Sequence, residues 1–190
     1  RYSRSVNTLA PGVRHIGTRD SAQDMLAMCH SNSEMAKEML LYLITKQFED
    51  GSCTPLSSKQ VGFICKTRAI KSDVHLWLPL LAHLLAAETD VEFLNTELPF
   101  LDKDGITQVG SATVWEHLLL AVEFTQNHLG SNSLPLTLRG DWNDIIGKFS
   151  QGGKGESVFA AQQYVVALDK LISLAKALGD TANEEKLVSY

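Results

Sequence analysis

Apolar residues along this chain recur mostly with the period of an α-helix. The periodic segments begin near a Ser, Thr or Asp that can cap a helix, and several end near a glycine. The pattern predicts a short helix capped by Asp20 or Ser21 that runs through Met28, one from Ser31 or Ser33 to Gly51, one capped by Ser72 and Asp73, one from Ser111 to near Gly130, one from Ser157 to Leu178 that Gly179 closes, and the start of another at Thr181.

The segments between these helices lack sustained periodicity. Residues 1–18 predict an irregular loop, and residues 52–71 a long loop with room for a short strand. Residues 90–101 predict a short amphipathic piece before the turn at Asp102-Lys103-Asp104-Gly105. No strands alternate with the helices and no heptad is sustained, so we expect an all-α fold of helical hairpins laid side by side. The longer loops would then gather on one face.

Composition and net charge argue against some classes of binding partner. With 190 residues, of which 44% are hydrophobic, the chain can bury the core of a single domain. The net charge of -5 and the absence of a Lys/Arg run argue against nucleic acid and anionic membranes as partners. The longest apolar runs, such as 118–122, are soon interrupted by charge, so we expect no membrane contact by this segment.

The cysteines bear on the redox compartment of the protein, and the chain ends on whether the sequence is part of a longer chain. Cys29, Cys53 and Cys65 are odd in number and lack paired metal spacing, which argues against a disulfide framework and against a metal site. A reducing compartment fits, and we expect a cytoplasmic protein. The chain starts at Arg1 without a signal-peptide pattern and stops just after a helix has begun, so we expect a piece of a longer chain.

The densest chemistry lies between Arg139 and Ser157. Asp141, Trp142, Asn143 and Asp144 place two carboxylates, an amide and a large aromatic side by side. Sugars are bound by such carboxylates and amides, together with an aromatic face that packs on the ring. A carboxyl held against an indole would be partly desolvated, which raises its pKa and suits a general acid. The alternative is that the polar residues are turn and cap residues and the tryptophan belongs to the core.

Other motifs point to structure rather than chemistry. The run Gly152-Gly153-Lys154-Gly155 lacks the spacing of a phosphate-binding loop and follows no strand. The basic cluster from Lys66 to Lys71 predicts a solvated loop. No Ser or Cys lies in the context of a nucleophile elbow. Four histidines on predicted helices lack metal-ligand spacing and are expected to be packed or surface residues: His75, His83, His117 and His128.

Short motifs in a fixed order give the chain a family resemblance. They are Arg19-Asp20-Ser21-Ala22-Gln23-Asp24, Gln47-Phe48-Glu49-Asp50-Gly51, Ser72-Asp73-Val74-His75-Leu76-Trp77-Leu78, Trp115-Glu116-His117, Gly140-Asp141-Trp142-Asn143-Asp144 and Gly155-Glu156-Ser157. In this order they resemble the inverting glycoside phosphorylases of glycoside hydrolase family 94, which act on cellobiose, chitobiose and β-oligoglucans. The resemblance covers nearly the whole chain. It implies that residues 1–190 are a fragment of one catalytic domain, an (α/α)6 barrel.

The resemblance also implies roles. Asp144 would be the general acid and Trp142 would line the sugar subsite beside it. Arg4 would contact phosphate, a co-substrate that attacks a β-linked di- or oligosaccharide and gives an α-sugar 1-phosphate. No cofactor is implied, and a homodimer of the full-length enzyme is compatible with the resemblance. The hydroxyls of the glycosyl unit would be bound by Arg14, Arg19 and Asp20.

The chain departs from the family pattern at two places, and three alternative functions stay open. Many relatives have Gly-Met where this chain has Ile145-Ile146, and Asp where it has Val74. An inverting hydrolase on a similar barrel would need a base, for which Glu116 or Glu156 would be proposed. The phosphorylase-like domain of a cyclic β-1,2-glucan synthase is a second rival. A helical-repeat interaction module, in which Trp142 and Asp144 only pack and turn, is the third.

Overall fold

The computed structural model describes residues 15–58 and 69–190 and is mostly helical. Its main helices are α1 (Thr18–Met28), α2 (Ser33–Ile44), α3 (Trp77–Glu88), α4 (Val114–Gln126), α5 (Val158–Leu178) and α6 (Thr181–Val188). Short 3-10 helices are η1 (Val74–Leu76), η2 (Glu92–Asn95), η3 (Ile146–Lys148) and η4 (Gln151–Gly153). The strands are β1 (His15–Gly17), β2 (Leu56–Ser58), β3 (Glu97–Leu101) and β4 (Gln108–Thr113).

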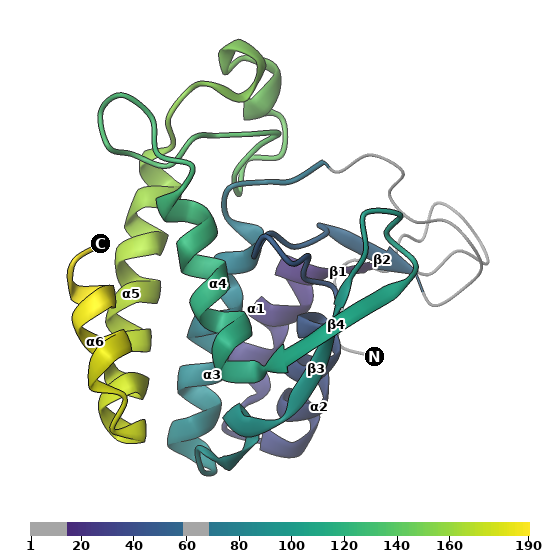
Figure 1. Cartoon of the computed structure of the whole chain (residues 1–190). Coiled ribbons are helices and arrows are strands. Elements are labelled where there is room, and N and C mark those ends of the chain that lie inside the picture. Colours follow the sequence, from purple (N-terminus) through teal and green to yellow (C-terminus); the bar gives the residue numbers. More distant parts are fainter. Residues whose placement is uncertain (1–14, 59–68) are drawn as a thin grey trace.

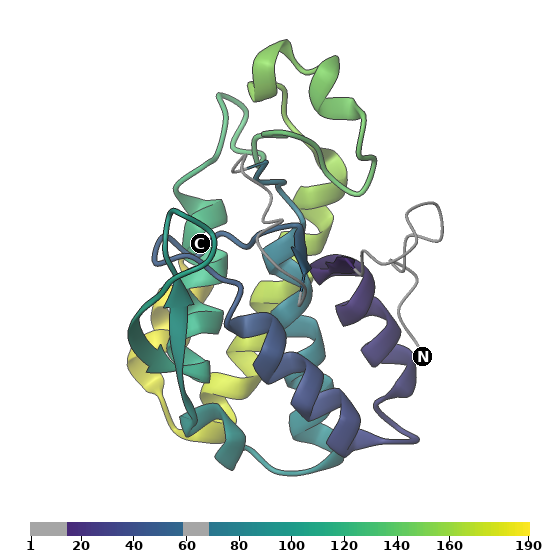
Figure 2. The ribbon, with the colours of Figure 1, turned by 90° about the vertical axis from the view of Figure 1, so that its right-hand side faces the viewer.

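Helix α3 lies at the centre of the helical layer (Figures 1 and 2). It contacts α1, α2, α4 and α5, and α6 packs on the outer side of α5. Leu78, Leu81 and Leu85 of α3 are fully buried in the core that these helices share. Burial of each such side chain contributes about 1.5–3 kcal/mol, so the packing of α3 holds the layer together. The (α/α)6 ring stays a prediction, since the described helices show a side-by-side layer.

Helix α5 matches the sequence expectation at both ends. The Ser157 side chain accepts a hydrogen bond from the backbone N–H of Ala160, and Gly179 ends the helix with a φ of 69°. A left-handed residue at this position suits glycine, which has no Cβ to clash. The expected helix from Ser157 to Leu178 is therefore confirmed, and α6 follows where a further helix was predicted.

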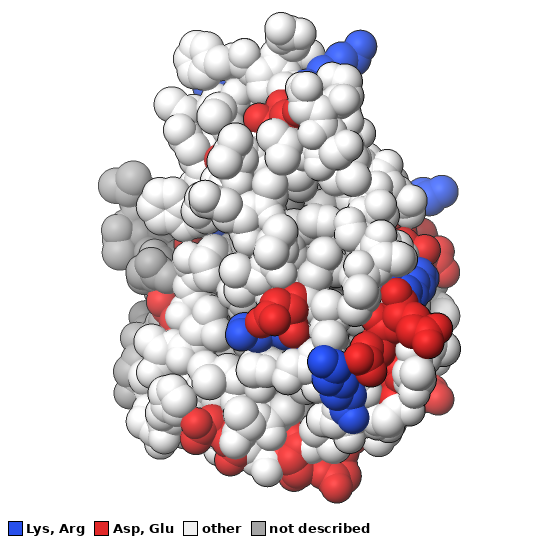
Figure 3. Space-filling model, turned by 90° about the vertical axis from the view of Figure 1, so that its left-hand side faces the viewer, with Lys and Arg blue, Asp and Glu red and all other residues white. Residues whose placement is uncertain are grey.

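Helix α5 also bears on the membrane question. In the part of the chain that the structure describes, it is the one helix long and apolar enough to cross a membrane by length and composition. It packs against α3, α4 and α6, as a core helix does, and core helices meet the same criterion. On the face beside α5 and α6, Lys and Arg are scattered among Asp and Glu (Figure 3). The expected lack of membrane contact stays a prediction.

A β-hairpin corrects the all-α expectation. Strands β3 and β4 pair antiparallel, with Glu97 opposite Thr113 and Phe100 opposite Val109. The predicted turn is present: the Asp104 carboxylate accepts hydrogen bonds from the backbone N–H groups of Ile106 and Thr107. Its flanks are too short and too weakly alternating to have been recognised as strands.

Several predicted boundaries shift. Strand β4 includes Ser111 and ends at Thr113, so α4 begins at Val114 with Thr113 as its cap. Helix α2 ends at Ile44 rather than near Gly51, and its cap is Asn32. Strands β1 and β2 form a second small antiparallel pair. The expected cap Asp73 makes no capping hydrogen bond, because its carboxylate is engaged elsewhere.

Candidate functional site

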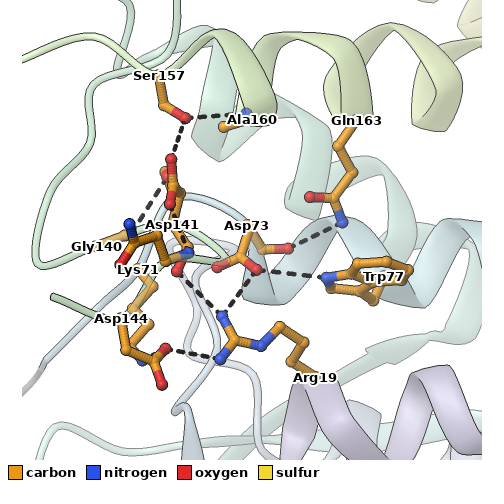
Figure 4. A network of polar contacts seen from close by, with 12 residues as sticks. Arg19, Lys71, Asp73, Trp77, Gly140, Asp141, Asp144, Ser157, Ala160 and Gln163 are labelled. Atoms are coloured by element: carbon orange, nitrogen blue, oxygen red, sulfur yellow. Dashed lines mark hydrogen bonds and ion pairs between the residues drawn. The ribbon is translucent and has the colours of Figure 1, made fainter. Parts of the chain in front are cut away.

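Arg19, in the first turn of α1, joins three distant parts of the chain (Figure 4). Its Nη1 donates to Asp73 Oδ2 at 3.1 Å and to the backbone carbonyl of Asp141 at 3.1 Å. Its Nη2 donates to Asp144 Oδ1 at 2.7 Å. The guanidinium therefore fixes the loop that carries Asp144 against the helical layer.

Asp73 holds Arg19 from the buried side. Its carboxylate is fully buried, and Oδ2 also accepts from Trp77 Nε1 at 3.4 Å. Burial raises the pKa of Asp73, and the neighbouring positive charge of Arg19 only partly offsets this effect. Among the described residues, Oδ1 has no hydrogen-bond partner, and Gln163 donates to the backbone carbonyl of Asp73 at 3.3 Å. Asp73 is thus an anchor at the bottom of the site.

Asp141 fixes the loop from within. Its Oδ2 accepts from Ser157 Oγ at 2.6 Å and its Oδ1 from the backbone N–H of Asn143 at 2.7 Å. The residue is only 5% exposed. Asp141 therefore does what the turn-and-cap alternative predicts for it, and of the two carboxylates in this run Asp144 is the one presented at the surface.

Asp144 lies between two positive charges. Besides Arg19, it binds the ammonium of Lys71 through the same oxygen, Oδ1. Partial burial works to raise the pKa of Asp144, but the hydrogen bonds and charges of Lys71 and Arg19 outweigh it and lower the pKa. The raised pKa expected from a neighbouring indole is therefore wrong for the site as it stands.

Trp142 is exposed on the same loop as Asp144. Its side chain is 54% exposed, and its ring is 6.4 Å from that of Phe159, centroid to centroid. Ile145, at one of the departures from the family pattern, is 56% exposed on the same loop. The loop thus presents an exposed aromatic and apolar surface, so Trp142 is not the core residue of the alternative interpretation.

A small cavity adjoins Asp144. Its volume is about 230 Å³. It is lined by Arg19, Asp20, Pro55, Ala69, Lys71, Val74 and Asp144. A larger cavity of about 380 Å³ lies elsewhere, lined by residues 48–50 and 101–103. We place the site at the smaller cavity because two cations and two carboxylates converge on it, whereas the larger one contains none of the predicted site residues.

The structure thus brings together Arg19, Asp20 and Asp144 of the predicted site residues. Arg4 and Arg14 lie outside the described residues, and Trp142 does not line the cavity. Sequence reasoning missed two neighbours. It placed Asp73 only within a motif and at a helix cap, and it assigned Lys71 to a solvated loop although the lysine side chain is only 16% exposed.

The candidate bases of a hydrolase are occupied. Glu116 closes the capping box of α4 with Thr113, which lowers the pKa of Glu116. Glu156 accepts from the backbone N–H and the side-chain amide of Asn132 at 2.9 and 3.0 Å. Neither lines the cavity beside Asp144. Within the described ranges, no three His, Cys, Asp or Glu side chains gather in a group that could hold a metal ion.

A family model fits this chain over nearly all of its length. The model of the glycosyl hydrolase 94 superfamily, catalytic domain, matches residues 1–189. The chain belongs to this family. Membership confirms the resemblance carried by the ordered motifs, which include both partners of the Arg19–Asp144 ion pair.

The chain is similar in sequence to several named proteins. Solabiose phosphorylase of Paenibacillus borealis is 35% identical over 84% of this chain, and N,N'-diacetylchitobiose phosphorylase of Vibrio furnissii is 27% identical over 97%. The cyclic beta-(1,2)-glucan synthase NdvB of Rhizobium meliloti (strain 1021) is 28% identical over 86%. The chain spans only 19%, 25% and 6% of the lengths of these three proteins.

Proposed function

We propose that this chain supplies the general acid of an inverting glycoside phosphorylase. The reaction would be the reversible phosphorolysis of a β-linked di- or oligosaccharide to an α-sugar 1-phosphate. One observation carries the proposal: in a member of family 94, a half-buried arginine and a lysine hold a surface carboxylate, Asp144, at the edge of a small cavity.

The chemistry needs only one carboxylic acid. Inorganic phosphate is already an anionic nucleophile, so no second carboxylate has to deprotonate water. Asp144 would give its proton to the glycosidic oxygen as the bond from that oxygen to the anomeric carbon breaks. Phosphate would form the new bond from the opposite face of the sugar ring, which inverts the configuration.

The neighbours of Asp144 would bind the glycosyl unit. Arg19 and Asp20 line the cavity and offer a donor and an acceptor for sugar hydroxyls. Trp142 offers an exposed ring that can pack on a sugar beyond the cavity. Arg14 remains proposed for a hydroxyl and Arg4 for phosphate, both on the basis of family resemblance alone.

Substrate binding would also prepare the acid. The two cations keep Asp144 ionised, whereas a general acid must carry a proton. Sugar hydroxyls that enter the cavity would compete for the donors of Arg19 and Lys71, and the pKa of Asp144 would then rise. In the synthetic direction, the ionised carboxylate would serve as the base that accepts the proton of the acceptor hydroxyl.

A second candidate keeps the same chemistry in another setting. Similarity to the Rhizobium cyclic glucan synthase favours a phosphorylase-like domain of such a synthase as the alternative. An inverting hydrolase is less favoured because Glu116 and Glu156 serve structural contacts. A cytoplasmic location and a homodimer stay predictions, as does the identity of the sugar.

Phosphorus NMR on the full-length protein tests the proposal. The protein would be incubated with inorganic phosphate and a panel of β-linked disaccharides that includes glucosides and N-acetylglucosaminides. A new α-sugar 1-phosphate signal would support phosphorolysis and identify the sugar. Free monosaccharide formed at a rate independent of phosphate would indicate a hydrolase instead. No reaction with any substrate would favour the interaction module.

A further inference from the structure

The side chain of Lys71 lies in the candidate site. Figure 4 shows Lys71 beside Asp144, whose Oδ1 its ammonium binds. The lysine side chain is only 16% exposed, and it lines the same cavity as Arg19 and Asp20. The basic cluster of residues 66–71 was expected to be a solvated loop, and for Lys71 this expectation is wrong. The reaction proposed above uses Lys71 only as one of the two cations that hold Asp144.

The backbone on both sides of Lys71 is bonded to the segment that leads into Asp144. Lys71 forms an antiparallel bridge with Leu138. The Ile70 carbonyl accepts from the N–H of Arg139 at 3.1 Å, and the N–H of Ser72 donates to the Gly140 carbonyl at 2.9 Å. Paired backbones of this kind keep their register. The lysine and the carboxylate are therefore held opposite each other by a built arrangement of the main chain.

The charges around Asp144 give Lys71 a distinct position. Arg19 approaches from α1 and shares its charge with the buried Asp73. Asp20 lines the cavity as a further carboxylate. Among the described residues, the ion-pair partner of Lys71 is Asp144. Within the described part of the chain, Lys71 thus contributes positive charge to Asp144 that no other carboxylate in direct contact shares, although this charge also acts at longer range on Asp73.

We propose that Lys71 is a positioning residue, which fixes the Asp144 carboxylate at the cavity and sets the pH range over which it works as acid in phosphorolysis and as base in synthesis. This inference rests on the proposed function. The proton of Asp144 goes to the glycosidic oxygen in one direction and is recovered from the acceptor hydroxyl in the other. Both directions therefore depend on the same carboxyl in opposite protonation states.

Removal of the lysine charge has opposite consequences for the two directions. A carboxyl without this neighbour keeps its proton to higher pH. Phosphorolysis, which needs the proton, would continue to higher pH. Synthesis, which needs the ionised form, would begin only at higher pH. A residue that merely supported the fold would, when replaced, lower the rates of both directions without shifting the pH dependence of either.

The test compares pH profiles of full-length variants in both directions. The wild type, Lys71→Met, Lys71→Arg and the control Lys148→Met would be assayed for kcat/KM, which reports the free enzyme. Lys148 lies on the same loop as Asp144 and is exposed. With Lys71→Met, we expect the alkaline limb of phosphorolysis and the acidic limb of synthesis to move to higher pH by about one unit. Lys71→Arg and Lys148→Met should leave both limbs in place.

The outcomes separate the two proposals. If the wild type phosphorolyses a substrate but neither limb moves in Lys71→Met, the role of Lys71 is overturned and the proposed function stands. If the wild type forms no sugar phosphate, the proposed function fails and takes this inference with it. If Lys71→Met does not fold, Lys71→Gln replaces it. Failure of both neutral variants to fold would make Lys71 a structural residue and also overturn the inference.

Discussion

Asp73 and Asp144 bind different nitrogens of one guanidinium. Arg19 donates from Nη1 to the fully buried Asp73 at 3.1 Å and from Nη2 to the exposed Asp144 at 2.7 Å. The buried carboxylate thus sets the orientation of the arginine, and the arginine sets the orientation of the surface carboxylate. The geometry of the proposed acid therefore depends on a residue that does not itself line the cavity.

The first prediction concerns Asp73→Asn. The neutral amide keeps the size of the side chain but loses the charge that orients Arg19, so kcat/KM for phosphorolysis should fall about tenfold or more. Burial already disfavours the charged carboxyl and raises its pKa. The loss of unfolding free energy should therefore be below the roughly 3–5 kcal/mol typical of a broken buried ion pair. Kinetics and chemical denaturation of the full-length variant measure both quantities.

Asp169→Asn is the matched control, since Asp169 is an exposed carboxylate on α5 that pairs with Lys170. It should leave both kinetics and stability near wild type. Wild-type kcat/KM in Asp73→Asn would show that Arg19 needs no anchor and would contradict the proposed dependence of Asp144 on Asp73.

The pH dependence of stability gives the second prediction. Asp73 has a raised pKa in the folded state, so its contribution is fully present below its unfolded pKa and is lost as pH rises through the folded value. Asp144 has a lowered pKa, so its contribution is present above its unfolded pKa and is lost as pH falls through the folded value. The ordinary pKa of both carboxyls, away from the fold, is 3.8.

Melting temperatures of the wild type, Asp73→Asn and Asp144→Asn between pH 3 and 7 would test these signs. Relative to the wild type, Asp73→Asn should gain stability as pH rises above about 4, whereas Asp144→Asn should lose stability as pH rises toward about 4 from below and should change little at higher pH. Because Asp144 is more than half exposed, its effect should be the smaller and should shrink in salt. The same sign for both variants would contradict the assignment.

The third prediction concerns the shape of the loop. A Cβ on Gly147 would lie 2.2 Å from the Arg139 carbonyl oxygen, which is backbone and cannot easily move aside. Gly147→Ala should therefore displace the segment that carries Asp144 and lower phosphorolysis severalfold or more. Gly152→Ala in the same loop meets nothing within 4 Å but has a φ of 73°. It should cost about 1 kcal/mol of stability and leave the kinetics close to wild type. Equal kinetic loss in both would indicate general loosening of the loop.

The fourth prediction concerns Ser157. Its hydroxyl donates to the buried Asp141 and accepts from the N–H of Ala160 at the start of α5. Ser157→Ala removes a helix cap and a partner of a buried carboxylate, so the free energy of unfolding should fall by about 1–3 kcal/mol. Ser189→Ala, at an exposed serine, should change stability by less than about 0.5 kcal/mol. Chemical denaturation distinguishes the two, and equal small losses would show that the Asp141 contact contributes little.

Sequence pattern predicted the parts of the fold that local signals determine. The cap at Ser157 and the glycine at Gly179 are local signals at the two ends of α5, so the sequence predicted both boundaries of this helix. The β3–β4 hairpin was not predicted, because its strands are short and pair through contacts that sequence periodicity does not show. Asp73 was assigned as a cap because a local partner is the only one that sequence can suggest.

The sequence named some of the residues that the structure brings together, but it did not show their electrostatics. Arg19 and Asp144 were both named through the family resemblance, although 125 positions separate them. Their direct ion pair, and the presence of Lys71 beside it, depend on the pairing of residues 70–72 with 138–140. No spacing rule encodes that pairing. The direction of the pKa shift of Asp144 was wrong for this reason.

The central claim is that Asp144 donates the proton to the leaving oxygen. The most direct measurement compares phosphorolysis by the wild type and Asp144→Asn on two β-glycosides of the same sugar. One is the natural disaccharide, whose leaving oxygen needs a proton, and the other carries 2,4-dinitrophenolate, which leaves without one. We predict that Asp144→Asn loses about 10²–10⁴-fold on the disaccharide and far less on the dinitrophenyl glycoside. Equal losses on both substrates, or wild-type rates on the disaccharide, would contradict the assignment of Asp144 as the general acid.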